Sequence, residues 1–303
     1  MSLVAAVAQA YFELVALDNE LAIVQQTLLT RDEGVRQAKL RFEGGLTSET
    51  AYQQAQVELA NTATLIPGLI RRLSAKENEL SFLCGEYPGN IQRSRMNNSI
   101  DLPERFTVNL SSELLKRRPD VRVAEQTLIA ANAAVGMAYT DRFPRLNLTG
   151  AYGFETDKFM SLLESPYGLI TGTLVSPLVS LGKKRARYRA QQTVYEQETA
   201  NFQKVVLTVF HEASNAITAY NTVREARERK NDLENAAKKY VDLARLQYIN
   251  GVIGYLDVLD AQRNYFEAQI GLSNAIRDEY IAVVNLYKAL GGGWEISENA
   301  KHA

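Results

Sequence analysis

Apolar and small side chains recur at helical spacing along most of the chain. The longest such run lies between Gly182 and Gly251, contains neither Gly nor Pro, and includes Val194 and Val205. Because residues three and four positions apart share one side of a helix, the spacing predicts a single helix over residues 183–249. At 1.5 Å per residue it would be roughly 100 Å long, several times the length of an ordinary globular helix.

The same periodicity predicts three further long helices. Pro67 and Gly68 predict a kink or break in the second of them, because proline cannot donate the helical hydrogen bond. Gly85 and the glycine run that starts at Gly291 predict left-handed caps that end two of the helices. The predicted ranges are 4–41, 48–83 and 256–290.

The chain also contains an internal repeat. Sliding the sequence over itself by 206 residues superposes Gly45 on Gly251 and Gly85 on Gly291 without a gap. The shared break, the shared terminal glycine and the absence of gaps argue against coincidence, so a long helical hairpin is predicted to occur twice. The other coinciding positions are Val35 and Val241, Ala38 and Ala244, Leu40 and Leu246, Phe42 and Tyr248, Ala55 and Ala261, Gln56 and Gln262, and Leu80 and Leu286.

Between the two hairpins the pattern changes from helical periodicity to alternation. Residues 145–154 place Leu146 and Leu148 on one face and polar or small side chains on the other, which predicts a β-strand. Residues 167–179 are a second β candidate, which Pro177 should end or confine to a sheet edge. From these residues alone a two-stranded flap on a helical protein is slightly favoured, and strands of a membrane β-barrel are the alternative.

Composition and charge exclude several classes of function. The chain is 46% hydrophobic and 23% charged, as expected of a folded protein. A net charge of −1 offers no basic field, so nucleic acid is not expected as a partner. The single cysteine, Cys84, excludes an internal disulfide framework, and His211 and His302 belong to no recognisable catalytic set. We therefore expect no enzyme, no metal site and no cofactor.

Two kinds of hydrophobic segment are absent from the sequence. No run of about 18 apolar residues is present, and the first residues lack the basic and apolar regions of a signal peptide. Residues 2 and 3 lead directly into helical periodicity, so the natural protein is expected to begin further upstream.

The segment over residues 110–153 resembles the outer membrane factors of the TolC and OprM type. The residues that carry this resemblance match the family in order and spacing, and the tips RFEGGLTS and QYINGVIGYLDVLDAQ look like its two helical-hairpin turns. Coverage extends over essentially the whole chain. The matching residues are Arg118-Pro119-Asp120, Glu125, Ala130-Ala131-Asn132 and Phe143-Pro144.

The resemblance implies a mainly α fold of pseudo-duplicated long helical hairpins that form an α-barrel, with a short β-hairpin contributing to a membrane β-barrel. It implies a homotrimeric exit duct in the outer membrane of a Gram-negative bacterium, extending into the periplasm and conducting substrates passively. The implied partners are a periplasmic adaptor protein, an inner-membrane pump and outer-membrane lipid. A soluble long-helix scaffold or adaptor is the alternative, but it would have no need of amphipathic strands.

The resemblance also implies a division of the chain. The family pattern would place a signal peptide, the first helices and a first strand hairpin before residue 4. The expected parts are a first helical hairpin at 4–84, a connecting segment at 85–144, a β-hairpin at 145–180, a second helical hairpin at 183–291 and a tail at 292–303.

Two groups of candidate functional residues follow. Asp257 and Asp260 lie one helical turn apart after the second turn, where the aligned residues of the first repeat are Ala51 and Gln54. In the family resembled, the matching aspartates line a periplasmic pore constriction, with Thr50 and Tyr255 as expected neighbours. Carboxylates that merely complement a helix N-terminus are the alternative.

The two turns are the second group, because glycine lets the backbone reverse and leaves main-chain groups accessible. The resemblance implies that they contact the adaptor; the alternative is that they are turns only. They comprise Phe42, Gly44, Gly45, Leu46, Thr47, Ser48, Asn250, Gly251, Val252, Ile253 and Gly254.

Overall fold

A computed structural model describes residues 2–93, 113–154, 166–176 and 181–292. The predicted tail at 292–303 lies almost wholly outside these ranges, as do residues 94–112 of the predicted connecting segment. The chain divides into two compact units, Met1–Arg117 with Phe210–Ala303 and Arg118–Val209. The elements in chain order are α1 (Ser2–Glu43), α2 (Glu49–Cys84), α3 (Glu113–Arg117), α4 (Pro119–Thr140), β1 (Arg145–Phe154), β2 (Pro166–Val175), α5 (Leu181–Ile249) and α6 (Tyr255–Ala289).

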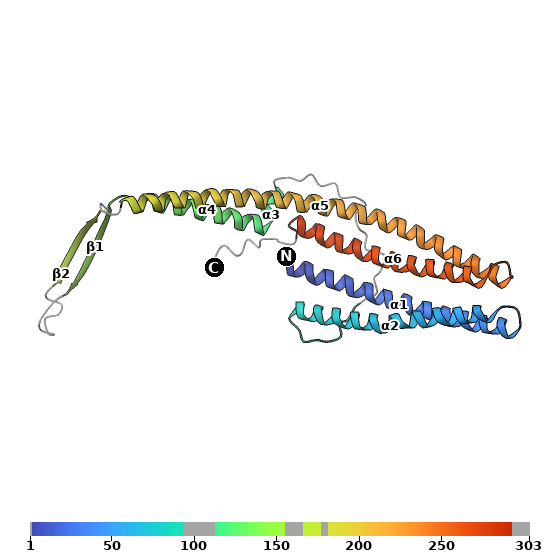
Figure 1. The fold of residues 1–303 in the computed structure, drawn as a ribbon. Helices are drawn as coiled ribbons and strands as arrows, with labels where there is room; N and C mark the ends of the chain where they lie inside the picture. The colour runs from blue at the N-terminus through green and yellow to red at the C-terminus, as the bar shows by residue number, and fades with distance from the viewer. Residues whose placement is uncertain (1, 94–112, 155–165, 177–180, 293–303) are drawn as a thin grey trace. The chain divides into compact units, whose positions relative to one another are not determined.

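The first unit consists mainly of two antiparallel helical hairpins. In Figure 1, α1 lies beside α2, and α6 lies beside the C-terminal part of α5. Leu14 of α1 packs with Leu73 and Leu80 of α2, while Tyr220 of α5 packs with Leu286 of α6. Each helix thus buries one apolar stripe against a neighbour, as helices that gain little from intrinsic propensity require.

Helix α2 is continuous through Pro67, so a break at this residue was wrong, while the alternative, a kink, stays a prediction. Pro67 lies on the exposed side of the helix, where the carbonyl that loses its partner can be hydrated. On the opposite side Leu69 and Leu73 are buried. Packing against α1 on both sides of the proline therefore maintains the helix across it.

The internal repeat is visible in the backbone. Among the described residues, those with positive φ are Gly45, Gly85, Gly251 and Gly291, at 71°, 77°, 73° and 70°. Each follows a helix, and the two pairs are the ones superposed by the sequence repeat. The mainly α fold of paired long hairpins is therefore confirmed.

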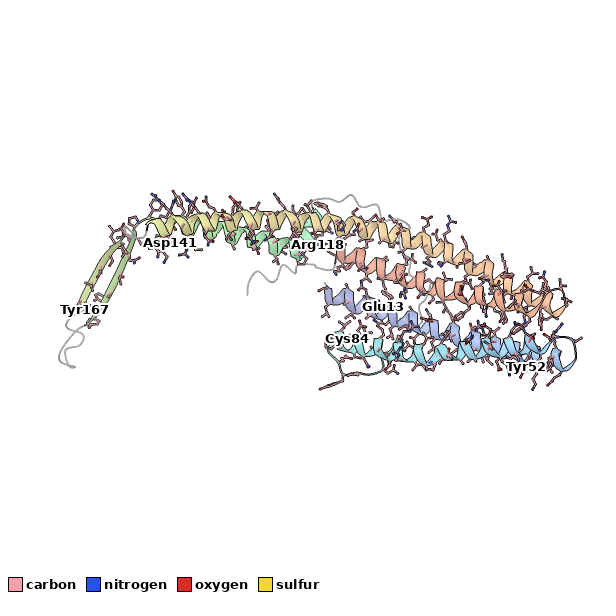
Figure 2. The ribbon with its side chains drawn as sticks, viewed as in Figure 1. Glu13, Tyr52, Cys84, Arg118, Asp141 and Tyr167 are labelled. Carbon is pink, nitrogen blue, oxygen red and sulfur yellow. The ribbon has the colours of Figure 1, made fainter. Side chains whose placement is uncertain are left out.

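The second unit contains α4, the N-terminal part of α5 and a two-stranded antiparallel sheet. Strand β1 pairs with β2 from Arg145 opposite Val175 to Phe154 opposite Pro166. Strand β2 ends at Val175, two residues before Pro177, and the predicted strand residues 177–179 lie outside the described residues. Figure 2 shows Asp141 beside this root of the hairpin and Tyr167 toward its far end.

The side chains of both strands are exposed on both faces within this single chain. Leu148 and Tyr152 of β1 are 72% and 77% exposed, and Ile170 of β2 is 85% exposed. Strands this apolar need a covering that the described residues do not provide. Separately, none of the described helices combines the length and hydropathy needed to cross a membrane.

Candidate functional site

The first turn, between α1 and α2, is closed by a double hydrogen bond around Gly45. The backbone N–H of Gly45 donates to the carbonyl of Phe42 at 2.9 Å, and that of Leu46 donates to Arg41 at 2.8 Å. This pattern is the Schellman motif, in which a left-handed residue lets the chain turn back and satisfy the last helical carbonyls. A residue with a side chain would be strained at the Gly45 φ of 71°.

The second turn, between α5 and α6, repeats this geometry. The N–H of Gly251 donates to Tyr248 at 3.0 Å, and the N–H of Val252 donates to Gln247 at 2.9 Å. The Asn250 side chain adds a bond from its Nδ2 to the Leu246 carbonyl at 2.8 Å. Leu46 and Val252, the equivalent residues after the two glycines, are 69% and 70% exposed. Each turn therefore presents an apolar side chain to the surroundings directly after its glycine.

The two turns lie at the same end of the first unit because a shared core joins them (Figure 1). Ala38 and Ala51 of the first hairpin pack with Tyr248, Tyr255 and Val258 of the second. Partly buried side chains around this core include the predicted tip residue Ile253. The structure thus brings the two predicted groups of tip residues together.

Arg41 strengthens this connection. Its Nη1 donates to the Ile249 carbonyl at 3.3 Å, and its guanidinium lies 4.8 Å from the ring centroid of Tyr248. The Tyr248 and Tyr255 rings are 5.4 Å apart. Three buried polar atoms at this end, Arg41 Nε, Thr47 Oγ1 and the Tyr248 hydroxyl, have no hydrogen-bond partner among the described residues. Native proteins contain few such atoms, so this end has unused hydrogen-bonding capacity.

Asp257 and Asp260 both lie on the exposed side of α6, but their environments differ. Asp257 Oδ2 accepts the backbone N–H of Gly254 at 3.0 Å, as a carboxylate in the first helical turn often does. Asp260 Oδ2 instead accepts Nδ2 of Asn264 at 3.1 Å and lies 3.5 Å from the Tyr240 hydroxyl. Partial burial, with Asp260 and Asp257 nearby, raises the pKa of Tyr240. Helix capping therefore accounts for Asp257 but not for Asp260.

The other two predicted constriction residues lie elsewhere. Thr50 is exposed on the first turn of α2. Tyr255 is only 8% exposed and lies in the core between the hairpins, away from the face that carries the aspartates. Gly34 leaves room for it, since a Cβ there would lie 3.3 Å from the tyrosine hydroxyl. Burial raises the pKa of Tyr255 to about 12.

A buried ionic cluster, which sequence reasoning missed, joins the first hairpin to α6. Arg31 Nη1 of α1 lies 3.0 Å from Glu58 Oε2 of α2, and the two side chains are 9% and 8% exposed. Arg263 of α6 donates to the other Glu58 oxygen, and Arg31 also donates to the Thr62 hydroxyl. Burial lowers the pKa of Arg31. One carboxylate thus connects all three helices.

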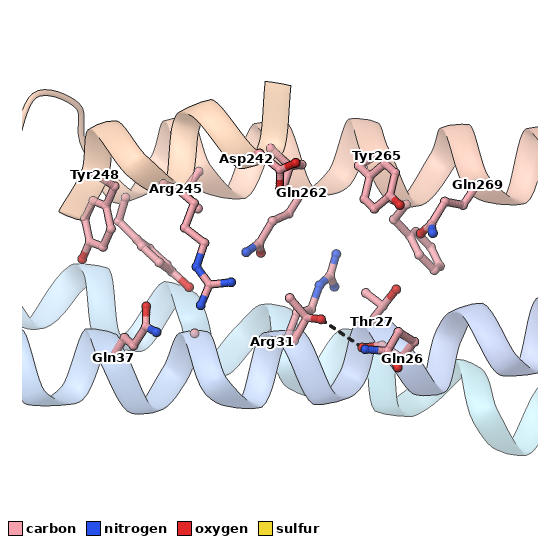
Figure 3. Close-up of a pocket in the computed structure, with 16 residues that line it drawn as sticks. Gln26, Thr27, Arg31, Gln37, Asp242, Arg245, Tyr248, Gln262, Tyr265 and Gln269 are labelled. Atoms are coloured by element: carbon pink, nitrogen blue, oxygen red, sulfur yellow. Dashed lines mark hydrogen bonds between the residues drawn. The ribbon is translucent and has the colours of Figure 1, made fainter. Parts of the chain in front are cut away.

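A pocket of about 280 Å³ adjoins this cluster between α1, α5 and α6. Figure 3 shows the guanidinium groups of Arg31 and Arg245 extending into it from opposite sides. Asp242 and Gln262 are also among its lining residues, and Thr30 donates to the Gln26 carbonyl at 3.1 Å on its wall. The pocket therefore combines apolar walls with charges of both signs.

Comparison with known proteins decides the family. The sequence pattern of the family described as "Outer membrane efflux protein" matches residues 1–86 and 110–292, which include both hairpins and both turns. The chain belongs to the outer membrane efflux protein family. Members of this family are outer-membrane proteins, which confirms the location expected from the resemblance.

Relatives of the chain include outer-membrane proteins of two Pseudomonas species. The outer membrane protein OprJ of Pseudomonas aeruginosa is 30% identical over 299 residues, covering 97% of this chain and 62% of OprJ. The toluene efflux pump outer membrane protein TtgI of Pseudomonas putida is 31% identical over 303 residues, covering 99% of this chain and 64% of TtgI. The chain therefore spans a little over three fifths of the length of these relatives.

Solved structures in the family share the fold. CusC, described as forming a transmembrane channel, matches with a TM-score of 0.86 at 26% identity, covering 96% of this chain and 68% of CusC. The open state of the MtrE outer membrane channel of Neisseria gonorrhoeae matches with a TM-score of 0.80 at 26% identity, covering 96% of this chain and 66% of MtrE. The outer membrane factor fold predicted from the resemblance is thus confirmed.

Proposed function

We propose that this protein is the outer-membrane exit duct of a tripartite efflux pump. It conducts substrates passively from the periplasm to the exterior and catalyses no reaction. The observation that carries the proposal is the family match across both hairpins, in a chain whose two turns repeat one geometry. OprJ and TtgI, which resemble the chain over nearly its whole length, are outer-membrane proteins by name, and TtgI is named as part of a toluene efflux pump.

The strand hairpin supports a place in the membrane for the second unit. Ten residues in each strand extend about 33 Å at roughly 3.3 Å per residue, enough to cross a hydrocarbon core of about 30 Å. Lipid on one face and neighbouring strands at the edges would cover the apolar side chains that this chain leaves exposed. We assign residues 145–180 to a β-barrel built by a homotrimer, and residues 4–84 and 183–291 to an α-barrel.

The turns are proposed as the site of adaptor contact. Leu46 and Val252 would supply apolar contacts, and backbone groups near Gly45 and Gly251 would be accessible because no side chain covers them. The adaptor in turn would connect the duct to an inner-membrane pump.

Asp257 and Asp260 are proposed to line the constriction of the duct. Three-fold repetition would place three copies of each carboxylate around one axis, where their charge would favour cations. The exposure of both side chains supports this role. Thr50, which is also exposed, remains a candidate neighbour, whereas Tyr255 could act only by supporting the hairpins from within their core.

Planar-bilayer recording of the full-length protein tests the proposal. We expect stepwise ionic currents that need no nucleotide or proton gradient, because the duct itself uses no energy. A protein that inserts as a trimer and carries no current at any voltage would refute the proposed function.

A further inference from the structure

The root of the β-hairpin is surrounded by positive charge. Residues 137–145 and 181–190, which form the end of α4, the start of β1 and the start of α5, contain seven Lys and Arg residues and one acidic residue, Asp141. This concentration contrasts with the net charge of −1 of the whole chain. We call it the basic collar; it comprises Arg142, Arg145, Lys183, Lys184, Arg185, Arg187 and Arg189.

Part of the collar is held in place by local contacts. Arg142 lies between two tyrosine rings, 4.2 Å from the centroid of Tyr139 and 4.5 Å from that of Tyr188. Lys184 Nζ donates to the Asp141 carbonyl at 2.6 Å, and Arg145 pairs with the Asp141 carboxylate. These contacts fix the end of α4 against the start of α5.

Three of the four remaining cations have no such structural role. Lys183, Arg185 and Arg189 are exposed, and their side chains form no ion pair with any residue in the described ranges. Arg187 is 70% exposed and lies 3.7 Å from the already paired Asp141. One face of α5 contacts α4. Lys183 and Arg187 lie along one edge of this face, and Arg185 and Arg189 lie along the opposite edge. The cations therefore extend around the helix.

Helix stability does not explain these charges. Cations in the first turn of a helix oppose its dipole, and the first turn of α5 contains no acidic residue to offset them. Like charges four residues apart, such as Arg185 and Arg189, also repel each other. An external anionic partner would offset both effects.

The position of the collar indicates which anion this is. Strands β1 and β2 are long enough to cross the hydrocarbon core, and the collar begins where they end. The headgroup layer is about 5–7 Å thick on each side of that core. Lys183 and Arg185, in the first two turns of α5, and the exposed rings of Tyr139 and Phe143 therefore fall at the depth where aromatic and basic anchors meet lipid headgroups.

We propose that the basic collar binds the phosphate groups of anionic phospholipids in the leaflet on the helical side of the membrane. The inference rests on the proposed function for the orientation of the hairpin. Beyond the proposed function, this inference names the class of lipid that is bound and the residues that select it. The structure-fixing contacts of Arg142 and Lys184 position the collar, while Lys183, Arg185 and Arg189 provide free charge for the ligand.

Native mass spectrometry of the full-length protein tests the proposal, with phosphatidylglycerol and phosphatidylethanolamine as competing lipids. The test variant carries Lys183→Gln, Arg185→Gln and Arg189→Gln. The matched control removes three exposed cations from a distant part of the same helix by Arg229→Gln, Lys238→Gln and Lys239→Gln. Each basic residue near a membrane surface contributes about fivefold in affinity, so the test variant should lose its preference for phosphatidylglycerol by tenfold or more. The control should keep it.

Equal phosphatidylglycerol retention by the test and control variants would overturn the proposal. Displacement of the lipid by inorganic phosphate at cellular concentration would also overturn it, because the site would then be one for a soluble anion. The charge-conserving variant Lys183→Arg, Arg185→Lys and Arg189→Lys should bind as the parent does, which separates charge from folding. Channel currents measured on the same samples distinguish the two proposals. A trimer that conducts ions but shows no lipid preference would refute lipid binding by the basic collar and would leave the proposed duct function standing.

Discussion

Arg31 and Glu58 form a salt bridge of 3.0 Å in the interior of the first hairpin, with each side chain less than a tenth exposed. Removing one partner from a buried pair leaves an uncompensated charge, at a cost of about 3–5 kcal/mol. We therefore expect Glu58→Gln to lower the free energy of unfolding by that amount, because it would leave both Arg31 and Arg263 without their carboxylate. Denaturant unfolding of the full-length protein in detergent measures the change.

The matched control for this variant is Glu20→Gln. Glu20 pairs with Arg72 at 2.8 Å, but the arginine side chain is 52% exposed. Exposed pairs contribute at most about 1 kcal/mol, so this variant should remain close to the parent. Losses of similar size for Glu20→Gln and Glu58→Gln would contradict the structural role of the buried cluster.

Gly251→Val should disrupt the second turn and with it the coupling to the adaptor. A side chain at φ 73° costs roughly 1–2 kcal/mol, so the turn would rearrange while the long helices remain packed. We expect pump-dependent export to be lost and the trimer to persist on native gels. Gly68→Ala is the control, because Gly68 lies within α2, away from the turns, and a Cβ there would meet nothing within 4 Å. Normal export by Gly251→Val would count against the turn as a contact site.

Asp257→Asn combined with Asp260→Asn should lower cation selectivity and block by divalent cations in planar-bilayer recordings. Asparagine preserves volume and can still accept the Gly254 N–H at position 257, so the change isolates charge. Glu43→Gln with Glu49→Gln removes two exposed carboxylates from the first hairpin at the same end and should leave selectivity intact. Unchanged selectivity in the aspartate variant would identify these residues as ordinary surface carboxylates.

The raised pKa of Tyr255 should make the stability of the helical hairpins fall at alkaline pH. Its folded-state pKa of about 12 lies above the ordinary value of 10.0, so the unfolded chain releases this proton first as the pH rises. The contribution to stability is present below pH 10 and is lost between about pH 10 and 12. Tyr255→Phe should therefore reduce the decline of the melting temperature over this interval, as measured by circular dichroism. An identical decline in both proteins would show that Tyr255 ionises normally.

The repeat and its turns could be predicted because they depend on local chemistry. A left-handed backbone requires glycine, so Gly45, Gly85, Gly251 and Gly291 indicated the helix ends before any packing was known. The aspartates at 257 and 260 were also found from sequence, although their role in a pore stays a prediction.

What could not be predicted depends on contacts between distant segments. The burial of Tyr255 results from α6 packing on α1 beside Gly34, and the continuity of α2 at Pro67 results from packing against α1. The buried cluster left a weak signal, since Arg31 lies seven residues from both Val24 and Ala38 in the buried stripe of α1. A charge within such a stripe indicates a partner, but only the tertiary structure identifies Glu58 and Arg263.

Export by living cells tests the account most directly. The full-length protein would be expressed with its adaptor and pump in cells that lack their own outer-membrane factor, and the efflux of a fluorescent pump substrate would be followed over time. We expect efflux to require all three components, and we expect Gly251→Val to abolish it while Gly68→Ala does not. A trimer present in the outer membrane that leaves efflux at the background level would contradict the central claim that this protein is the exit duct.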